Sequence, residues 1–90
     1  SRAAGAFVVL RSGVPLVYLE RGGRSLALFE GATSDESWVE ALAQLAASGQ
    51  VRAIEVQKVD GRPIADCQDI SDLLLQGGFR SGYRGPILRP

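Results

Sequence analysis

The chain of 90 residues contains no histidine, no methionine and a single cysteine, Cys67. Without histidine, the usual general base beside a serine or cysteine nucleophile is missing. Without a second cysteine there is no internal disulfide, and a transition-metal site lacks its preferred ligands. These absences argue against a self-contained enzyme or a zinc-binding domain, and they indicate that Cys67 is a passive thiol in or near the core.

Long apolar runs are also absent, since none approaches the roughly 20 residues that cross a bilayer. No charged-then-apolar leader precedes the first strand-like segment, so we expect a cytoplasmic domain with no membrane partner. With 46% apolar and 22% charged residues the composition is near the globular average, and its length predicts one domain over residues 1–90. A chain that lacks methionine and starts on Ser1 is expected to be excised from a longer protein.

The formal net charge is zero, which is not typical of a strongly basic nucleic-acid-binding domain. The signs are nevertheless unevenly placed, with a net charge of +2 over residues 1–30, −3 over 31–60 and +1 over 61–90. Nine of the ten cations are arginine, a composition that a GC-rich genome produces and that also suits phosphate recognition. No acid follows Asp72, so the end of the chain favours a local basic face.

The first third of the chain predicts a three-strand meander. Two β-rich runs, residues 6–11 and 14–20, are joined at a Ser-Gly dipeptide that suits a two-residue hairpin turn. Pro15 lacks an amide donor and should lie at the start of its strand or on an open edge, which places the second strand near a rim. Residues 25–29 form the third strand. Both faces of the first strand are apolar, which favours a sheet that is covered on both sides or curled toward a barrel.

The remaining residues predict two helices and two further strands. Trp38, Leu42 and Leu45 recur at helical spacing, with Ser34 as N-cap and Gly49 as the stop. Residues 51–59 read as a fourth strand, 60–63 as a turn, 65–79 as a second helix that Gly77 and Gly78 end with Phe79 folding back, and 86–89 as a last strand. The predicted fold class is α+β, with a curled, mainly antiparallel sheet in the order β-β-β-α-β-α-β that forms a partial barrel at most. The predicted core is Leu10, Leu16, Tyr18, Leu26, Leu28, Trp38, Leu42, Leu45, Ile54, Val56, Leu73, Leu74 and Phe79.

The RGGR sequence of residues 21–24 has two interpretations. Two glycines between strands are what a tight hairpin requires. Glycine-rich turns also bind phosphate, but phosphate loops more often precede a helix than a strand. We interpret RGGR first as a turn, with phosphate contact by Arg21 or Arg24 as an additional role.

The acidic residues carry no catalytic pattern. Asp35 and Glu36 lack the apolar strand that precedes the metal-binding acids of a helicase motor, and no GxxxxGK[ST] sequence is present. Three aspartates in residues 66–72 recur every third residue, so they drift around a helix and are explained by capping and solvation. Lys58 has an exposed phase in its strand. Among the aromatic residues, Tyr83 is the better candidate for stacking on a base, because it stands between two arginines in a glycine-rich tail.

Four pieces of the sequence together resemble a known family: YLERGGRSLALF, the W…AL..L helix closed by Gly49, VDGRPI, and LLLQGGFRSGYRGPILRP. They resemble the last segment of the large helicase-related (Lhr) proteins, which are bacterial superfamily-two DNA helicases. The resemblance implies a parent with an ATP-driven 3′-to-5′ motor, winged-helix modules and a C-terminal extension. Its final module looks like a small barrel-like unit that stands beside winged helices in some DNA glycosylases. A helper role in glycosylase-type base chemistry is therefore a distant alternative.

Under this resemblance we expect residues 1–90 to be a non-catalytic C-terminal accessory domain of an ATP-dependent DNA-repair helicase. It would contact DNA or an RNA:DNA hybrid, or brace adjacent winged-helix modules, and hold no cofactor, since ATP and Mg²⁺ belong to the parent's motor. The alternative is a protein-interaction module that self-associates along an apolar rim near residues 14–18. No catalytic or metal-binding residue is expected. The candidate nucleic-acid-binding residues are Arg21, Arg24, Arg80, Tyr83, Arg84 and Arg89.

Overall fold

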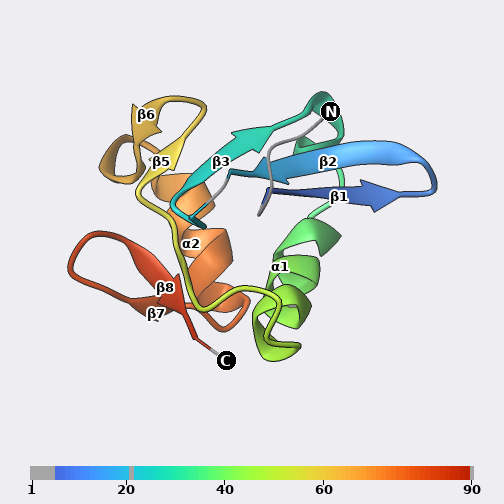
Figure 1. Cartoon of the computed structure of the whole chain (residues 1–90). Coiled ribbons are helices and arrows are strands. Elements are labelled where there is room, and N and C mark those ends of the chain that lie inside the picture. Colours follow the sequence, from blue (N-terminus) through green and yellow to red (C-terminus); the bar gives the residue numbers. More distant parts are fainter. Residues whose placement is uncertain (1–5, 21, 90) are drawn as a thin grey trace.

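Two small sheets and two helices make up the part of the chain that the computed structural model describes, residues 6–20 and 22–89. A five-stranded sheet has the order β1-β2-β3-β5-β6, and a three-stranded sheet has the order β4-β8-β7. Both helices lie on one side of the five-stranded sheet, and the β7–β8 hairpin is beside α2 (Figure 1). In chain order the elements are β1 (Phe7–Arg11), β2 (Val14–Leu19), β3 (Ser25–Leu28), the 3-10 turn η1 (Glu30–Thr33), α1 (Ser37–Ala47), β4 (Ile54–Glu55), β5 (Lys58–Val59), β6 (Arg62–Pro63), the 3-10 turn η2 (Ile64–Asp66), α2 (Gln68–Gln76), β7 (Arg80–Ser81) and β8 (Pro86–Leu88).

The predicted α+β class is confirmed. All strand pairings are antiparallel except that of β3 with β5, within the described residues. No closed barrel forms over this part of the chain, because the strands divide between two sheets. The described residues hold eight strands where five were predicted, because β6 and β7 are additional short strands and the predicted fourth strand is divided into β4 and β5.

The β1–β2 hairpin turns at the predicted dipeptide. Ser12 and Gly13 have φ values of 52° and 81°, the paired positive values of a two-residue turn whose twist matches that of its strands. On either side of the turn, Arg11 pairs with Val14. The first three strands lie side by side in the order β1-β2-β3, which confirms the meander.

β2 lies inside the sheet, so the prediction that it runs near a rim is wrong. Pro15 is near the start of β2 as expected, opposite Leu10 of β1. Because β3 pairs with β2 only from Val17 onward, Pro15 lies beyond that ladder and its missing amide leaves no ladder bond unmade there. The outer strands of this sheet are β1 and β6.

A register shift in the β1–β2 pair changes which side chains enter the core. Val9 is opposite Val17 but Leu10 is opposite Pro15, so Leu16 is an extra residue on β2, as in a β-bulge. Leu16 and Val17 are consecutive and both buried, whereas Leu10, which was predicted in the core, is 59% exposed. A prediction that assigns alternate residues of β2 to the core, beginning with Leu16, therefore misses Val17 and Leu19.

The predicted fourth strand is two strands in two different sheets. β4 pairs with β8, while β5 pairs with β3 and β6. Ile54 and Val56 are fully buried, as predicted. The amide of Gln57 donates to the carbonyl oxygen of Arg24 at 2.9 Å, so the backbone changes its pairing partner at this point. The turn predicted over residues 60–63 is present and joins β5 to β6, with φ of 53° at Asp60 and 80° at Gly61.

α1 begins later than predicted. Ser34, the predicted N-cap, ends η1 instead, and its hydroxyl donates to the carbonyl oxygen of Gly31 at 3.3 Å. The carboxylate of Asp35 takes the capping role, accepting from the Ser37 amide at 2.9 Å, because a carboxylate satisfies an unpaired N–H of the first turn. Gly49, with φ of 78°, follows the end of the helix as predicted.

α2 ends in the predicted manner. The amide of Phe79 donates to the carbonyl oxygen of Leu74 at 3.0 Å, and that of Gly78 donates to the carbonyl oxygen of Leu75 at 3.2 Å. This pair of bonds, with φ of 108° at Gly78, is a Schellman motif. The Phe79 side chain returns to the core, where it is 3% exposed.

The predicted core is largely confirmed, and the core residues that the prediction missed lie on β2 beside the bulge, on α1, in β5 and in η2. Tyr18 is half-buried, and the Cys67 thiol is buried as expected. The indole of Trp38 is fully buried and its Nε1 donates to the carbonyl oxygen of Ala32 at 3.3 Å, which identifies it as a packing residue. Predicted core residues that are buried are Leu16, Leu26, Trp38, Leu42, Ile54, Val56, Leu74 and Phe79; Leu28, Leu45 and Leu73 pack against them, and the prediction missed Val17, Leu19, Val39, Ala46, Val59 and Ile64.

Candidate nucleic-acid interface

Gly22, Gly23 and Arg24 of the RGGR sequence lie in the connection between β2 and β3. Gly22 and Gly23 have φ of 95° and 71°, and the Gly23 amide donates to the carbonyl oxygen of Glu20 at 3.0 Å. A Cβ built on Gly23 would lie 2.7 Å from the carbonyl oxygen of Ala53. Glycine is therefore required there for close packing against the segment that leads into β4. The turn interpretation is confirmed, while Arg21 lies outside the described residues.

Arg24 and Lys58 are neighbours because β3 and β5 pair in parallel. Ser25 is opposite Lys58 in that register, and the carbonyl oxygen of Arg24 accepts from the Lys58 amide at 3.3 Å. Both side chains are exposed. The backbones of two cationic residues that are distant in the sequence are thus adjacent at one end of the five-stranded sheet.

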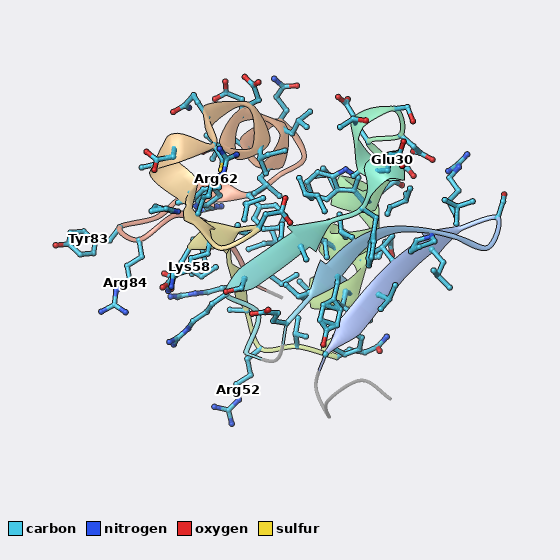
Figure 2. The ribbon with its side chains drawn as sticks, turned by 90° about the horizontal axis from the view of Figure 1, so that it is seen from above. Glu30, Arg52, Lys58, Arg62, Tyr83 and Arg84 are labelled. Carbon is cyan, nitrogen blue, oxygen red and sulfur yellow. The ribbon has the colours of Figure 1, made fainter. Side chains whose placement is uncertain are left out.

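The β7–β8 hairpin brings a third cation to the same region. The amide of Val56 donates to the carbonyl oxygen of Pro86 at 2.9 Å, which ties the start of β8 to the segment that precedes Lys58. Tyr83 and Arg84 occupy the tip of this hairpin and are exposed. Figure 2 shows Tyr83, Arg84 and Lys58 projecting on the same side of the molecule, with Glu30 on the other side.

We call Arg24, Lys58 and Arg84 the basic strip. Within residues 6–20 and 22–89 the structure holds one ion pair, in which Arg11 Nε lies 3.1 Å from Asp35 Oδ2. None of the three side chains of the basic strip therefore forms a contact ion pair with a carboxylate in this part of the chain. Exposed cations grouped in this way attract phosphate.

Arg80 and Arg89 lie on the three-stranded sheet, apart from the basic strip. They line an open groove of about 530 Å³ together with Ile87 and other residues of β7 and β8. Arg80 and Glu55 are both paired with Ile87, one from each side, so their side chains share one face of this sheet. Glu55, on the same face as Arg80, accepts a hydrogen bond from Gln57 Nε2 at 2.7 Å.

Two further exposed cations flank these groups. Arg62 lines a groove with Asp60, Asp66 and Asp69, so its surroundings are electrostatically mixed. Arg52 is in the loop before β4 and points away from the hairpin tip (Figure 2). Neither belongs to the basic strip.

Lys58 was not among the candidate nucleic-acid-binding residues predicted from the sequence, although its exposed phase in the strand was predicted. No local pattern predicts a parallel pairing of β3 with β5, and that pairing is what places Lys58 beside Arg24. Of the predicted residues, Tyr83 and Arg84 project on the side where Lys58 projects (Figure 2), and Arg24 adjoins Lys58 through its backbone. Arg80 lies in β7, and Arg89 directly follows β8.

The acidic residues are arranged as helix and turn groups. Asp66, Asp69 and Asp72 are exposed, and Asp72 accepts from Gln68 Nε2 at 2.9 Å. Hydrogen bonds from the side chain and the backbone amide of Ser37 hold the pKa of Asp35 below its ordinary value of 3.8, outweighing slight desolvation. In the described part of the chain, no three His, Cys, Asp or Glu side chains gather where a metal ion could bind. None of the helices described is long and apolar enough to traverse a lipid bilayer.

The fold and surface define a small α+β domain with an exposed basic strip beside an aromatic hairpin tip. The chain is 35% identical over 96 aligned positions to a protein of Mycolicibacterium smegmatis described as "Lhr helicase/ probable uracil glycosylase". The alignment takes in 98% of this chain and spans 6% of the length of that relative. No protein-family model matches the chain, and no solved structure matches it. The similarity supports a relationship to a segment of an Lhr helicase.

Proposed function

We propose that this chain is a non-catalytic accessory module of an Lhr-type, ATP-dependent DNA-repair helicase, and that it contacts nucleic acid through the basic strip. The observation that carries the proposal is the identity of 35% to an Lhr helicase over nearly the whole chain. In this proposal, the motor with its ATP and Mg²⁺ lies elsewhere in a longer bacterial protein. The module holds no cofactor and works in the cytoplasm.

The electrostatics of the surface support a contact with phosphate. The chain has no net charge, so attraction to nucleic acid depends on local grouping of cations. Lys58 and Arg84 project on one side of the molecule (Figure 2), and the backbone of Arg24 adjoins that of Lys58. None of the three has a carboxylate partner among the described residues. We expect DNA or an RNA:DNA hybrid to bind there with an affinity that falls as the salt concentration rises.

Fluorescence anisotropy of labelled oligonucleotides tests this proposal. The chain is titrated into single-stranded DNA, duplex DNA and an RNA:DNA hybrid at about 50 mM and about 200 mM salt. We expect micromolar binding that weakens with salt. A variant in which Arg24, Lys58 and Arg84 are all changed to Gln should lose most of it, whereas Arg11→Gln at the opposite hairpin should not. Salt-independent binding, or equal binding by both variants, would contradict the proposal.

Bracing of neighbouring winged-helix modules is the second role that the relationship to a helicase favours. In the parent protein, deletion of this module would then lower the thermal stability of the winged-helix region even where the basic strip has been neutralised. Unchanged stability of that region after deletion excludes bracing.

A protein-interaction module is the alternative that one observation favours. β1 is an outer strand of its sheet, and Leu10, Val14 and Phe29 are exposed apolar residues. The outer edge of such a strand, beside exposed apolar side chains, is a site where another strand can be added. The rim predicted along β2 is wrong, so self-association would use β1. A mass that rises with concentration, together with no oligonucleotide binding, would favour this alternative.

A further inference from the structure

The tip of the β7–β8 hairpin is built so that two side chains are forced outward. The Gly82 amide donates to the carbonyl oxygen of Gly85 at 3.1 Å and closes the loop around Tyr83 and Arg84. A Cβ on Gly82 would lie 2.6 Å from the carbonyl oxygen of Gly85, and a Cβ on Gly85 would collide with that of Val56. The two glycines therefore leave no room for side chains where the loop meets the protein.

Tyr83 is placed differently from every other large apolar or aromatic side chain among the described residues. Its relative exposure is 102%, compared with 59% for Leu10, the next highest of these. Both faces of the phenol ring are open to water, and a fully exposed aromatic ring adds nothing to the core. Turn tips ordinarily carry Gly, Asn or Asp, so a Tyr-Arg pair between two glycines is not explained by the needs of the turn.

Beside the tip lies an open groove that both apolar and polar side chains line. Its volume is about 240 Å³, and it runs between the hairpin and α2. Ile64, Leu75 and Pro86 supply apolar surface, and Gln68 and Ser71 supply hydrogen-bonding groups. A ring that stacks on Tyr83 can thus have its edge close to polar side chains.

We infer that Tyr83 and Arg84 form a subsite for one unpaired nucleotide, in which the base stacks on the Tyr83 ring and Arg84 binds the adjoining phosphate. This inference rests on the proposed nucleic-acid contact and names the form of nucleic acid bound. An exposed ring can stack only on a base whose face is free, which selects single strands or unpaired ends over continuous duplex. Phosphates that continue from Arg84 along the strand would lie over the remainder of the basic strip.

The charge of the neighbourhood favours nucleic acid over a protein partner at this tip. Arg84 and Lys58 project on the same side as Tyr83 (Figure 2), and Arg84 is not paired with a carboxylate in the described part of the chain. A stacking ring beside unpaired cations matches the alternating bases and phosphates of a single strand.

The test compares four chains on three probes. The chains are the unsubstituted chain of residues 1–90, Tyr83→Ser, Tyr83→Phe and Arg11→Gln, which is the control at the β1–β2 hairpin. The probes are an oligothymidylate of about 12 nucleotides, an abasic strand of the same length, and a blunt duplex of the same length, because single-strand sites span about 4–16 nucleotides.

We expect Tyr83→Ser to bind oligothymidylate about fivefold to about 150-fold more weakly, which corresponds to about 1–3 kcal/mol for the loss of one stacked base. Tyr83→Phe should retain affinity within about twofold, because it keeps the ring. The abasic strand and the duplex should bind the unsubstituted chain and Tyr83→Ser with equal affinity. Since Tyr83 is fully exposed, its replacement leaves the fold intact, and urea unfolding checks this.

The outcomes separate failure of the subsite from failure of the proposed function. Oligothymidylate binding that is unchanged in Tyr83→Ser overturns the subsite and leaves the basic strip as the contact. Equal loss on the duplex overturns single-strand selectivity. If the unsubstituted chain binds no probe, the nucleic-acid proposal itself fails.

Discussion

Two hairpins at opposite ends of the molecule reverse the chain direction with different residues at their tips (Figure 1). The β1–β2 hairpin closes with Ser12 and Gly13, which carry no functional side chain at the tip, and its arginine is paired with Asp35. The β7–β8 hairpin places glycines outside the tip and a tyrosine and an arginine at it. The first hairpin is organised to end a strand pair, and the second is organised to present side chains. This difference, rather than overall charge, is the reason that we propose a nucleic-acid contact at the second hairpin.

The largest effect that separates the two hairpins is expected from their glycines. Gly85→Ala forces a Cβ into the carbonyl oxygen of Val56, so the tip must shift, at about 2–4 kcal/mol of unfolding free energy. A Cβ at position 13 would have no atom within 4 Å. Gly13→Ala should therefore lower the unfolding free energy only by the strain of the positive φ, about 1–2 kcal/mol. Urea unfolding of the two variants measures the difference, and an equal loss in both would show that the tip of the second hairpin is not held by this contact.

The next effect concerns the charges of the two hairpins. Arg84→Gln should reduce the slope of log affinity against log salt by about 1, because one phosphate contact is lost. Arg11→Gln should leave the slope unchanged, since its guanidinium is already paired with Asp35. Oligonucleotide titrations at several salt concentrations give both slopes. Equal slopes for the two variants would remove Arg84 from the interface.

A smaller effect is expected from Asp35, which supports the first hairpin and the start of α1. Its pKa is lower in the folded chain than the ordinary 3.8, so its contribution to stability is present above that value and is lost as the pH falls through the lowered pKa. The unfolding free energy of Asp35→Asn should therefore fall less in acid than that of the unsubstituted chain. Urea midpoints measured from about pH 6 to about pH 2 test this, and parallel curves for the two chains would contradict it.

The smallest effect is expected from the exposed apolar residue of the first hairpin. Leu10→Lys should change the unfolding free energy by no more than about 0.5 kcal/mol, because the side chain is mostly in water. Oligonucleotide affinity should stay the same. A large change in sedimentation-derived mass would show that β1 supports self-association and would give the first hairpin a binding role of its own.

Local signals predicted the parts of the fold that local chemistry determines. The Ser-Gly turn, the glycine stop of α1 and the Schellman end of α2 follow from residues a few positions apart. The bulge at Leu16 and the split of residues 51–59 between two sheets depend on pairing with distant segments. The same limit applies to the site: Tyr83 and Arg84 were visible in the sequence, whereas Lys58 joined them only through a parallel pairing.

The parallel pairing of β3 with β5 has a kinetic consequence for the basic strip. The chain between these strands includes all of α1, so Arg24 and Lys58 meet only after a long loop has closed at an entropic cost. An unfolded chain carries the same cations without their spacing. A ligand that needs the spacing therefore binds the folded form alone and raises its stability in proportion to the logarithm of ligand concentration. The midpoint of thermal unfolding thus becomes a readout of oligonucleotide binding that needs no label on either molecule.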